Sequence, residues 1–307
     1  MQLQDYINNV RVLINDTNSA NFTDATLTNF INQARIRVAM DTHCLRGFLS
    51  LTGGNALNTI GGQENYNYNG SCAGVTVTAG GSGFTGTPTI SFVNAVGDTT
   101  GAGATATATV SNGAVTAINM TNWGTNYTLA PTVNIVGGGG TGATARATIL
   151  TNIFDIISMT TIWGQTRIMH YWLPFSEFQT WYRQLTFNES VPGAYTLHQG
   201  IGQAFLFPIP DSAYTLEWDV LMTPNPLTSN SQVDTQILSP FSDAVQFFVA
   251  HLCAASLKNF QTAEYWYTGK RQQPGKYDSR IMQLASTTFC RRVFNPYRSY
   301  LKRLRRM

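Results

Sequence analysis

The stretch GSGFTGTPTISF at residues 81–92 recurs as GTNYTLAPTVNI at residues 124–135, and GAGATATATV at residues 101–110 recurs as GTGATARATI at residues 140–149. In each copy a glycine turn with an aromatic residue leads to a strand that begins with proline. A second glycine turn then leads to a strand of alternating small residues. The alternation of Ala with Thr has the two-residue period of a pleated strand and not the period of a helix. We therefore predict a duplicated all-β module.

This module, about residues 70–149, stands apart from the rest of the chain by its low charge. It contains one base, Arg146, and one acid, Asp98, among many Gly, Thr, Ala and Val residues. The first copy is longer than the second by four residues, in the loop VNAVGDTTG. We expect a sandwich-like module inserted into a larger domain. The candidate contact residues on the surface of the insert are Phe84, Trp123 and Tyr127.

Apolar residues recur at three- and four-residue steps near both ends of the chain, as on one face of an amphipathic helix. At the N-terminus the pattern predicts two helices, and the second begins near Thr23 or Asp24, whose side chains can accept a hydrogen bond from a first-turn amide. Farther along, Pro240 suits the first turn of a helix, and a last helix is predicted from about Tyr277 toward Phe289. Terminal helices would be poorly covered alone, so we expect them to pack together as one bundle.

The expected fold class is α+β. The segments between the terminal helices and the repeat are typical of strands, with one short helix at residues 176–184 that begins with a capping box of Ser176 and Gln179. The expected regions are a helical bundle from residues 1–50 and 238–290, a central β domain from 51–69 and 150–237, the inserted duplicated all-β module from 70–149, and a basic C-terminal arm from 291–307.

The formal net charge of +3 conceals a strongly basic C-terminus. The last 17 residues contain seven bases and no acid, whereas residues 1–290 contain 12 bases and 16 acids. This asymmetry predicts an anionic partner for the C-terminal arm. Aromatic residues interleaved with arginine are typical of protein interfaces and of nucleic-acid contacts, and the same composition also fits a solvated, disordered end.

Motifs that carry catalysis or bind a cofactor find little support. Gly137, Gly139 and Gly142 match GxGxxG, but a strand-like segment follows them where a dinucleotide site needs a helix, so we interpret them as a turn. The four histidines and four cysteines form no CxxC or HExxH pattern, and we expect reduced, packed thiols and neither a metal nor a cofactor. No apolar run is long enough for a membrane span. We expect a protein without enzymatic activity or a membrane partner.

Two segments resemble phage head-to-tail connector, or adaptor, proteins of podovirus type. These are LINDTNSANFTDATLTNFINQARIRVAMDT at residues 13–42 and the run from FPIPDSAYTLEWDV to LKNFQTAEYW at residues 207–266. The resemblance covers about residues 1–60 and 150–290. The inserted repeat is similar to GGxGYxxxP modules of several phage structural proteins, and it is a departure from the minimal adaptor.

The resemblance implies a ring of identical subunits, commonly a dodecamer, that lies beneath the portal protein at the head–tail interface of the virion. It also implies contact with tail, nozzle or collar proteins, DNA passing through the channel, and assembly in the host cytoplasm. In such proteins the C-terminal segment docks on the portal. The matching candidate portal-binding residues here are Arg291, Arg292, Phe294, Tyr297, Arg298, Tyr300, Lys302, Arg303, Arg305 and Arg306.

An alternative interpretation is a tail-associated structural protein that binds a receptor or a carbohydrate. The repeated module would then be its working part, with Trp123 and Tyr127 as contact residues. The helical ends and the basic arm are features that such a module does not need. A cell-wall hydrolase is a third interpretation.

Overall fold

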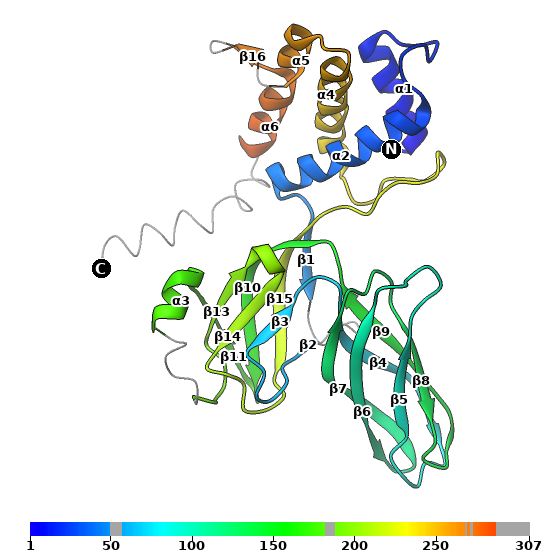
Figure 1. Cartoon of the computed structure of the whole chain (residues 1–307), viewed down its shortest axis with the longest axis vertical. Helices are drawn as coiled ribbons and strands as arrows, with labels where there is room; N and C mark the ends of the chain where they lie inside the picture. The colour runs from blue at the N-terminus through cyan, green and yellow to red at the C-terminus, as the bar shows by residue number, and fades with distance from the viewer. Residues whose placement is uncertain (50–56, 182–187, 268, 271–272, 287–307) are drawn as a thin grey trace. The chain divides into compact units, whose positions relative to one another are not determined.

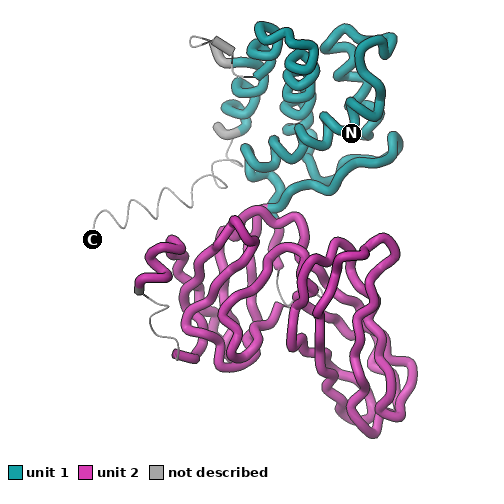
Figure 2. Tube along the Cα trace, viewed as in Figure 1, with its two compact units in different colours: residues 1–46, 222–307 teal, residues 47–221 magenta. Residues whose placement is uncertain are grey.

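The computed structural model describes residues 1–49, 57–181, 188–267, 269–270 and 273–286. The chain divides into two compact units, coloured separately in Figure 2. The helical unit contains residues 1–46 and 222–307, and the β unit contains residues 47–221. Among the helices of the described ranges, none has the length and apolar character that a membrane crossing needs.

The helical unit is built by segments from both ends of the chain (Figure 1). Its α2 begins after Thr23, whose side-chain oxygen accepts a hydrogen bond from the amide of Thr26 at 3.2 Å. Its α4 has Pro240 in the first turn, where the missing amide hydrogen costs no helical hydrogen bond. The described elements are α1 (Leu3–Ile14), α2 (Asp24–Thr42), α4 (Ser239–Ser256), α5 (Phe260–Trp266), β16 (Gly269–Lys270), β17 (Gln273–Pro274) and α6 (Lys276–Ser286).

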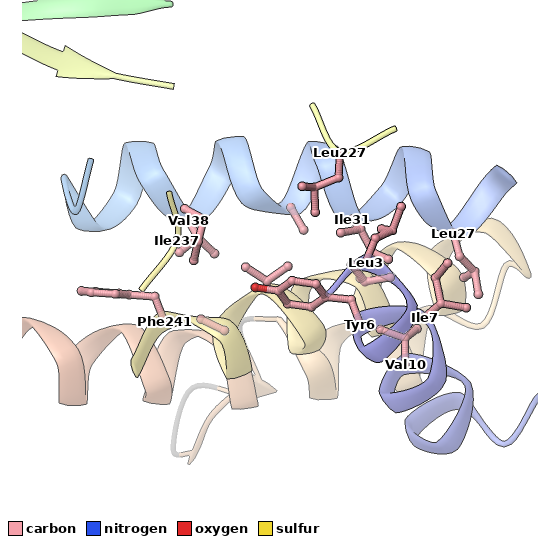
Figure 3. Close-up of a cluster of buried hydrophobic side chains, with 14 of the residues drawn as sticks. Leu3, Tyr6, Ile7, Val10, Leu27, Ile31, Val38, Leu227, Ile237 and Phe241 are labelled. Atoms are coloured by element: carbon pink, nitrogen blue, oxygen red, sulfur yellow. The ribbon is translucent and has the colours of Figure 1, made fainter. Parts of the chain in front are cut away.

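One hydrophobic core joins α1, α2, α4 and α6. Figure 3 shows the side chains of α1 beside Leu27 and Ile31 of α2, and Phe241 of α4 beside Val38 of α2. Leu227 and Ile237 come from the segment that precedes α4. Burying one large apolar side chain stabilises a fold by about 1.5–3 kcal/mol, so this shared core holds the N-terminal and C-terminal helices together. The buried side chains labelled in the figure are Leu3, Tyr6, Ile7, Val10, Leu27, Ile31, Val38, Leu227, Ile237 and Phe241.

Two small sheets form the central part of the β unit. The first has the order β1-β15-β10-β11, with β2 also paired to β15, and the second has the order β12-β13-β14-β3. Helix α3 packs on the second sheet, where the ring of Phe178 lies 6.4 Å from the ring of Phe207. The elements are β1 (Arg46–Leu49), β2 (Leu57–Asn58), β3 (Asn65–Asn67), β10 (Ile153–Trp163), β11 (Thr166–Met169), β12 (Tyr171–Trp172), α3 (Phe175–Trp181), β13 (Ala194–His198), η1 (Gln199–Ile201), β14 (Gln203–Phe207) and β15 (Thr215–Met222).

The repeated sequence forms a six-stranded sheet with the order β4-β9-β8-β5-β6-β7. Its end strands approach each other, because a Cβ on Gly80 of β4 would lie 2.8 Å from the carbonyl oxygen of Val115 of β7. The sheet is therefore a nearly closed barrel. Its strands are β4 (Ser71–Ser82), β5 (Thr89–Val93), β6 (Ala102–Ser111), β7 (Ala114–Thr125), β8 (Thr132–Val136) and β9 (Thr141–Leu150).

The two sequence copies occupy equivalent positions in this barrel. Strands β5 and β8 pair about Ser91 and Asn134, which are themselves 43 residues apart, and the β4–β9 pair of one half corresponds to the β7–β6 pair of the other. The first copy thus pairs mainly with the second copy. Two hydroxyl contacts follow the same relation, namely Thr78 with Thr144 at 2.8 Å and Thr121 with Thr105 at 2.7 Å.

The expected α+β architecture based on a helical bundle is wrong. Of the described residues, 39% lie in strands and 28% in helices, so the chain is mostly β. The expected sandwich form of the repeat is also wrong, because alternation specifies a strand with one packed face but not what covers that face. Here the sheet curls over its own side chains, which include Ile90, Val115, Ile118 and Val133. The finer division of the chain into four regions stays a prediction.

Candidate assembly site

A buried ion pair fastens the segment between β15 and α4 to α2. The guanidinium of Arg35 donates from Nε and Nη2 to the two carboxylate oxygens of Asp234, each at 2.8 Å, and both side chains are almost completely buried. Nη1 of Arg35 donates to the carbonyl oxygen of Asn225 at 2.7 Å, and the hydroxyl of Tyr6 donates to Asp234 at 3.3 Å. This clasp brings together α1, α2 and residues 222–238.

The charge state of the clasp follows from its surroundings. Burial opposes ionisation of Asp234, but the bonds from Arg35 and from the amides of Ile237 and Gln236 outweigh it and hold the pKa of this carboxyl below its ordinary value. Burial, together with the neighbouring carboxylate, raises the pKa of Tyr6 above its ordinary value. The pair is therefore a fixed, fully hydrogen-bonded cross-link at neutral pH.

The chain terminus is held by the same segment. The amide of Leu3 donates to the carbonyl oxygen of Gln232 at 3.1 Å, and the amide of Asp234 donates to the carbonyl oxygen of Met1 at 2.8 Å. Asn32 of α2 adds two bonds to the backbone of Leu227. The segment is thus docked along most of its length, and it presents a fixed surface of the helical unit.

An aromatic stack positions α6, the last described element. The ring of Tyr267 stacks 4.8 Å from His251 of α4 and 5.5 Å from Tyr277 of α6. The hydroxyl of Tyr277 donates to Asp41 of α2 at 2.8 Å, and Asp41 also pairs with Arg37 at 2.9 Å. The buried Tyr277 therefore fixes the start of α6 against both α2 and α4.

The ten candidate portal-binding residues, from Arg291 to Arg306, lie outside the described residues, as does Cys290. The described chain ends at Ser286 in α6, five residues before Arg291. The helix that precedes the basic arm is consequently anchored by Tyr277, while the assignment of the arm itself stays a prediction.

The three aromatic residues expected on the surface of the insert are buried, and this prediction is wrong. Phe84 lies against Gly140 and Tyr127 against Gly101, so closely that neither glycine could carry a Cβ. Because Phe84 and Gly101 belong to the first copy and Tyr127 and Gly140 to the second, each aromatic ring fills a gap left by a glycine of the other copy. The rings are core residues that lock the two halves of the barrel together.

Trp123, the third of these residues, joins the barrel to the central sheets of the β unit. Its ring centroid lies 4.9 Å from that of Tyr66 in β3 and 5.9 Å from that of Trp218 in β15. Aromatic residues that serve as platforms for sugars or bases must be accessible. The burial of Trp123 and Tyr127 thus removes the feature on which the carbohydrate-binding interpretation depended.

Asp98, the one acid of the repeat, ties two loops of the barrel. Its carboxylate accepts hydrogen bonds from the amides of Thr100 and Gly101 in its own loop, and from the amides of Thr128 and Leu129 in the other loop. The hydrogen bond from the amide of Thr100 makes the largest contribution to lowering the pKa of Asp98. Burial raises this pKa, but by less than the hydrogen bonds lower it. The longer loop of the first copy is therefore held in a defined conformation by the hydrogen bonds of Asp98.

We predict that Asp98→Asn lowers the melting temperature of the protein at pH 7 and that this difference shrinks in acid. A carboxylate with a lowered pKa stabilises the fold above its ordinary pKa, near 4, and loses this contribution as the pH falls through the lowered value. Thermal unfolding followed by circular dichroism at pH 7 and pH 3 tests this, with the exposed Glu177→Gln as the control. An unchanged melting temperature for Asp98→Asn at pH 7 would contradict the role.

A comparison with family models gives one match, to the family described as SU10 adaptor protein, over residues 89–288. This range is about two-thirds of the chain. The chain belongs to the SU10 adaptor protein family. Curated proteins give no match. Membership of the SU10 adaptor family makes the chain a phage adaptor-type structural protein and a virion component.

The match of the SU10 adaptor family runs from β5 to the residues just past α6. It thus includes the segment that carries Asp234 and helices α4 to α6, but not α1 and α2, which supply Tyr6 and Arg35. The clasp was missed in the sequence because its two residues are 199 positions apart. One local signal pointed to it: Arg35 lies among Ile31, Ala34 and Val38, on the apolar stripe of a helix, where a cation needs a buried partner.

No group of three or more His, Cys, Asp or Glu residues that could hold a metal ion occurs in the described part of this adaptor-family chain. Burial raises the pKa of the Cys72 and Cys253 thiols to about 12, so both are protonated at neutral pH. Thiolates are the form of cysteine that binds metals and attacks electrophiles. Both side chains therefore act as small packed groups.

Proposed function

We propose that this chain is the head-to-tail adaptor subunit of a tailed phage, without enzymatic activity. In this proposal identical copies form a ring beneath the portal protein, DNA passes through the ring, and the C-terminal arm of each copy docks on the portal. Membership of the adaptor family supports contact with portal and tail components. The proposed ring, DNA passage and portal docking rest on the distribution of positive charge along this chain.

The sequence concentrates positive charge in the C-terminal arm, which contains seven of the 19 bases. Two of the arginines of the helical unit, Arg11 and Arg35, are buried in ion pairs with aspartates. The β unit, residues 47–221, contains eight acids and three bases. A channel wall with the acidic composition of the β unit would not bind the phosphates of passing DNA. A basic arm with aromatic residues, in contrast, is suited to binding a protein surface that carries carboxylates.

The last described helix before the arm, α6, is fixed in the helical unit. Helix α6 is held by the buried Tyr277 and by Arg280, which donates to Asp243 of α4 at 3.1 Å. An arm tethered to an anchored helix can bind a partner while the folded unit stays unchanged. Arg and Tyr side chains are frequent anchors of such contacts.

We predict that removing residues 291–307 weakens binding to the portal at least tenfold and leaves the described fold intact. A second variant, in which the seven bases of the arm become glutamine, separates charge from aromatic contact; it should lower the association rate and its dependence on salt. Lys258→Gln with Lys276→Gln, two bases outside the arm, is the matched control. Native mass spectrometry and surface binding with purified portal measure these effects.

Two outcomes would overturn the arm's proposed role. Truncated protein that still binds the portal with full affinity would place the docking surface elsewhere. Arm-dependent binding to duplex DNA, with a steep loss of affinity as salt rises and no effect on portal binding, would assign the arm to phosphate contacts.

A further inference from the structure

Four exposed side chains of the types that interfaces favour lie within ten residues of the β unit. Aromatic residues, methionine and arginine are enriched in protein interfaces over the rest of the surface. The exposed fractions are 57% for Trp163, 69% for Met169, 67% for Tyr171 and 40% for Trp172. These residues come from β10, β11 and β12, which follow one another in the chain.

The segment 166–172 runs along the free edges of both central sheets. In the described residues, β11 is the last strand of the first sheet and β12 is the last strand of the second. Arg167, Met169 and Tyr171 are exposed, while His170 between them is buried, as the alternation of an extended strand requires. The amide of His170 donates to the carbonyl oxygen of Met159 at 2.9 Å, and its Nε2 lies 2.7 Å from the hydroxyl of Thr161. The exposed side chains are thus held in place.

Within the described residues, the free edge of β11 has no lysine, proline, bulge or further strand, although the strand is short and carries the charge of Arg167. Edge strands are commonly protected by lysine, proline, a bulge or a covering element. β11, with the sequence TRIM, contains no lysine or proline, and it pairs with β10 in regular register from Thr160–Met169 to Trp163–Thr166. Its one charge is balanced, because Arg167 donates to Glu217 at 3.0 Å.

The opposite edge of the same sheet also exposes an aromatic side chain. β1 is the first strand of that sheet in the described residues, and Phe48 at its centre is 64% exposed. The two edges differ in sequence, so a contact between them joins copies head to tail, as in a ring whose rotation between neighbours closes. A second copy of the chain supplies the edge of its β1 strand and the side chain of its Phe48, which can contact Met169 of the first copy.

We propose that the edge formed by residues 163–172 binds the β1 edge of a second copy, so that the first sheet continues from one subunit to the next. This inference rests on the proposed ring. It assigns the contact between neighbouring subunits to Trp163, Met169 and Tyr171 on one side and Phe48 on the other. The C-terminal arm, which is proposed to contact the portal, takes no part in it.

Disulfide trapping in assembled phage particles tests the contact. The double variant Met169→Cys with Phe48→Cys is supplied to a phage that lacks the gene, and the particles are oxidised and separated without reductant. We expect a ladder of covalent multimers up to the ring size, and only monomer from either single variant. Monomer alone from the double variant, or a product with another virion protein, would overturn the proposal. A protein absent from particles would instead refute the proposed function.

A second measurement does not depend on engineered thiols. Tyr171→Asp with Met169→Asp places charge at the edge without touching a buried residue, so the monomer should keep its circular dichroism spectrum. We expect this variant to bind the portal through its arm. The fraction of complete rings, measured by native mass spectrometry, should be at least tenfold lower than for the wild type. Glu189→Lys, an exposed change elsewhere on the β unit, is the control. Complete rings from the double aspartate variant would contradict the assignment.

Discussion

Replacing Asp234 with alanine is expected to destabilise the helical unit by about 3–5 kcal/mol, because Arg35 would stay buried without its carboxylate. The loss is larger than the worth of the pair itself, since the cost of burying an unpaired guanidinium is added to the lost attraction. The same substitution frees residues 222–238 from α2 and removes the acceptor of the Tyr6 hydroxyl. Both ends of the chain should loosen together.

Hydrogen exchange locates this effect. Amides of α1 and α2 should exchange faster in Asp234→Ala, while those of the barrel strands keep their wild-type rates and act as an internal reference. Arg37→Ala removes an exposed pair with Asp41 and should cost about 0.2–1 kcal/mol. Equal effects of the two substitutions would contradict the role of the clasp.

The clasp should also make the helical unit sensitive to acid. The pKa of Asp234 is lowered in the folded protein, so its contribution is complete above pH 4 and is lost as the pH falls through the lowered value. Asp234→Asn should therefore unfold at neutral pH more readily than the wild type, and the difference should diminish in acid. The paired replacement Arg35→Met with Asp234→Leu should recover part of the loss, because no charge stays buried.

The sequence repeat predicted the strands of the β module but neither their pairing nor the closure of the sheet. The order of segments in the two copies is a property of the chain, and it reappears in the equivalent pairings of β4 with β9 and of β7 with β6. Closure depends on how a sheet twists and on which residues its ends bring together, such as Gly80 and Val115. Alternating Ala and Thr residues contain no information about that approach.

The exposure of the aromatic residues was predicted wrongly for a related reason. An aromatic residue in a glycine-rich turn has no apolar neighbour in sequence, so Phe84 and Tyr127 resemble surface residues. Their partners, Gly140 and Gly101, belong to the other copy and are defined by the space that a missing Cβ leaves. Helical stripes, in contrast, were readable because i, i+3 and i+4 neighbours share a face within one element.

Trp123→Ala is expected to cost about 3–5 kcal/mol in the β unit, the usual range for removing a buried tryptophan. The ring fills the space between Tyr66 and Trp218, and its loss leaves a cavity where the barrel joins the central sheets. Its indole nitrogen has no hydrogen-bond partner within the described residues, so the contribution comes from packing. Trp123→Phe should thus retain more than half of the stability that alanine loses.

Trp163→Ala provides a matched control for this experiment, because the same side chain is 57% exposed there. The control should change the stability of the monomer by less than about 1 kcal/mol. Urea unfolding gives the free energies, and hydrogen exchange shows whether β3, β7 and β15 are the strands that loosen. Comparable losses from Trp123→Ala and Trp163→Ala would mean that the barrel and the central sheets do not depend on this ring. If only Trp123→Ala lowers the free energy of unfolding strongly, the tryptophan at this position of the repeat serves to pack the buried junction between the barrel and the central sheets, and not an exposed surface of the barrel.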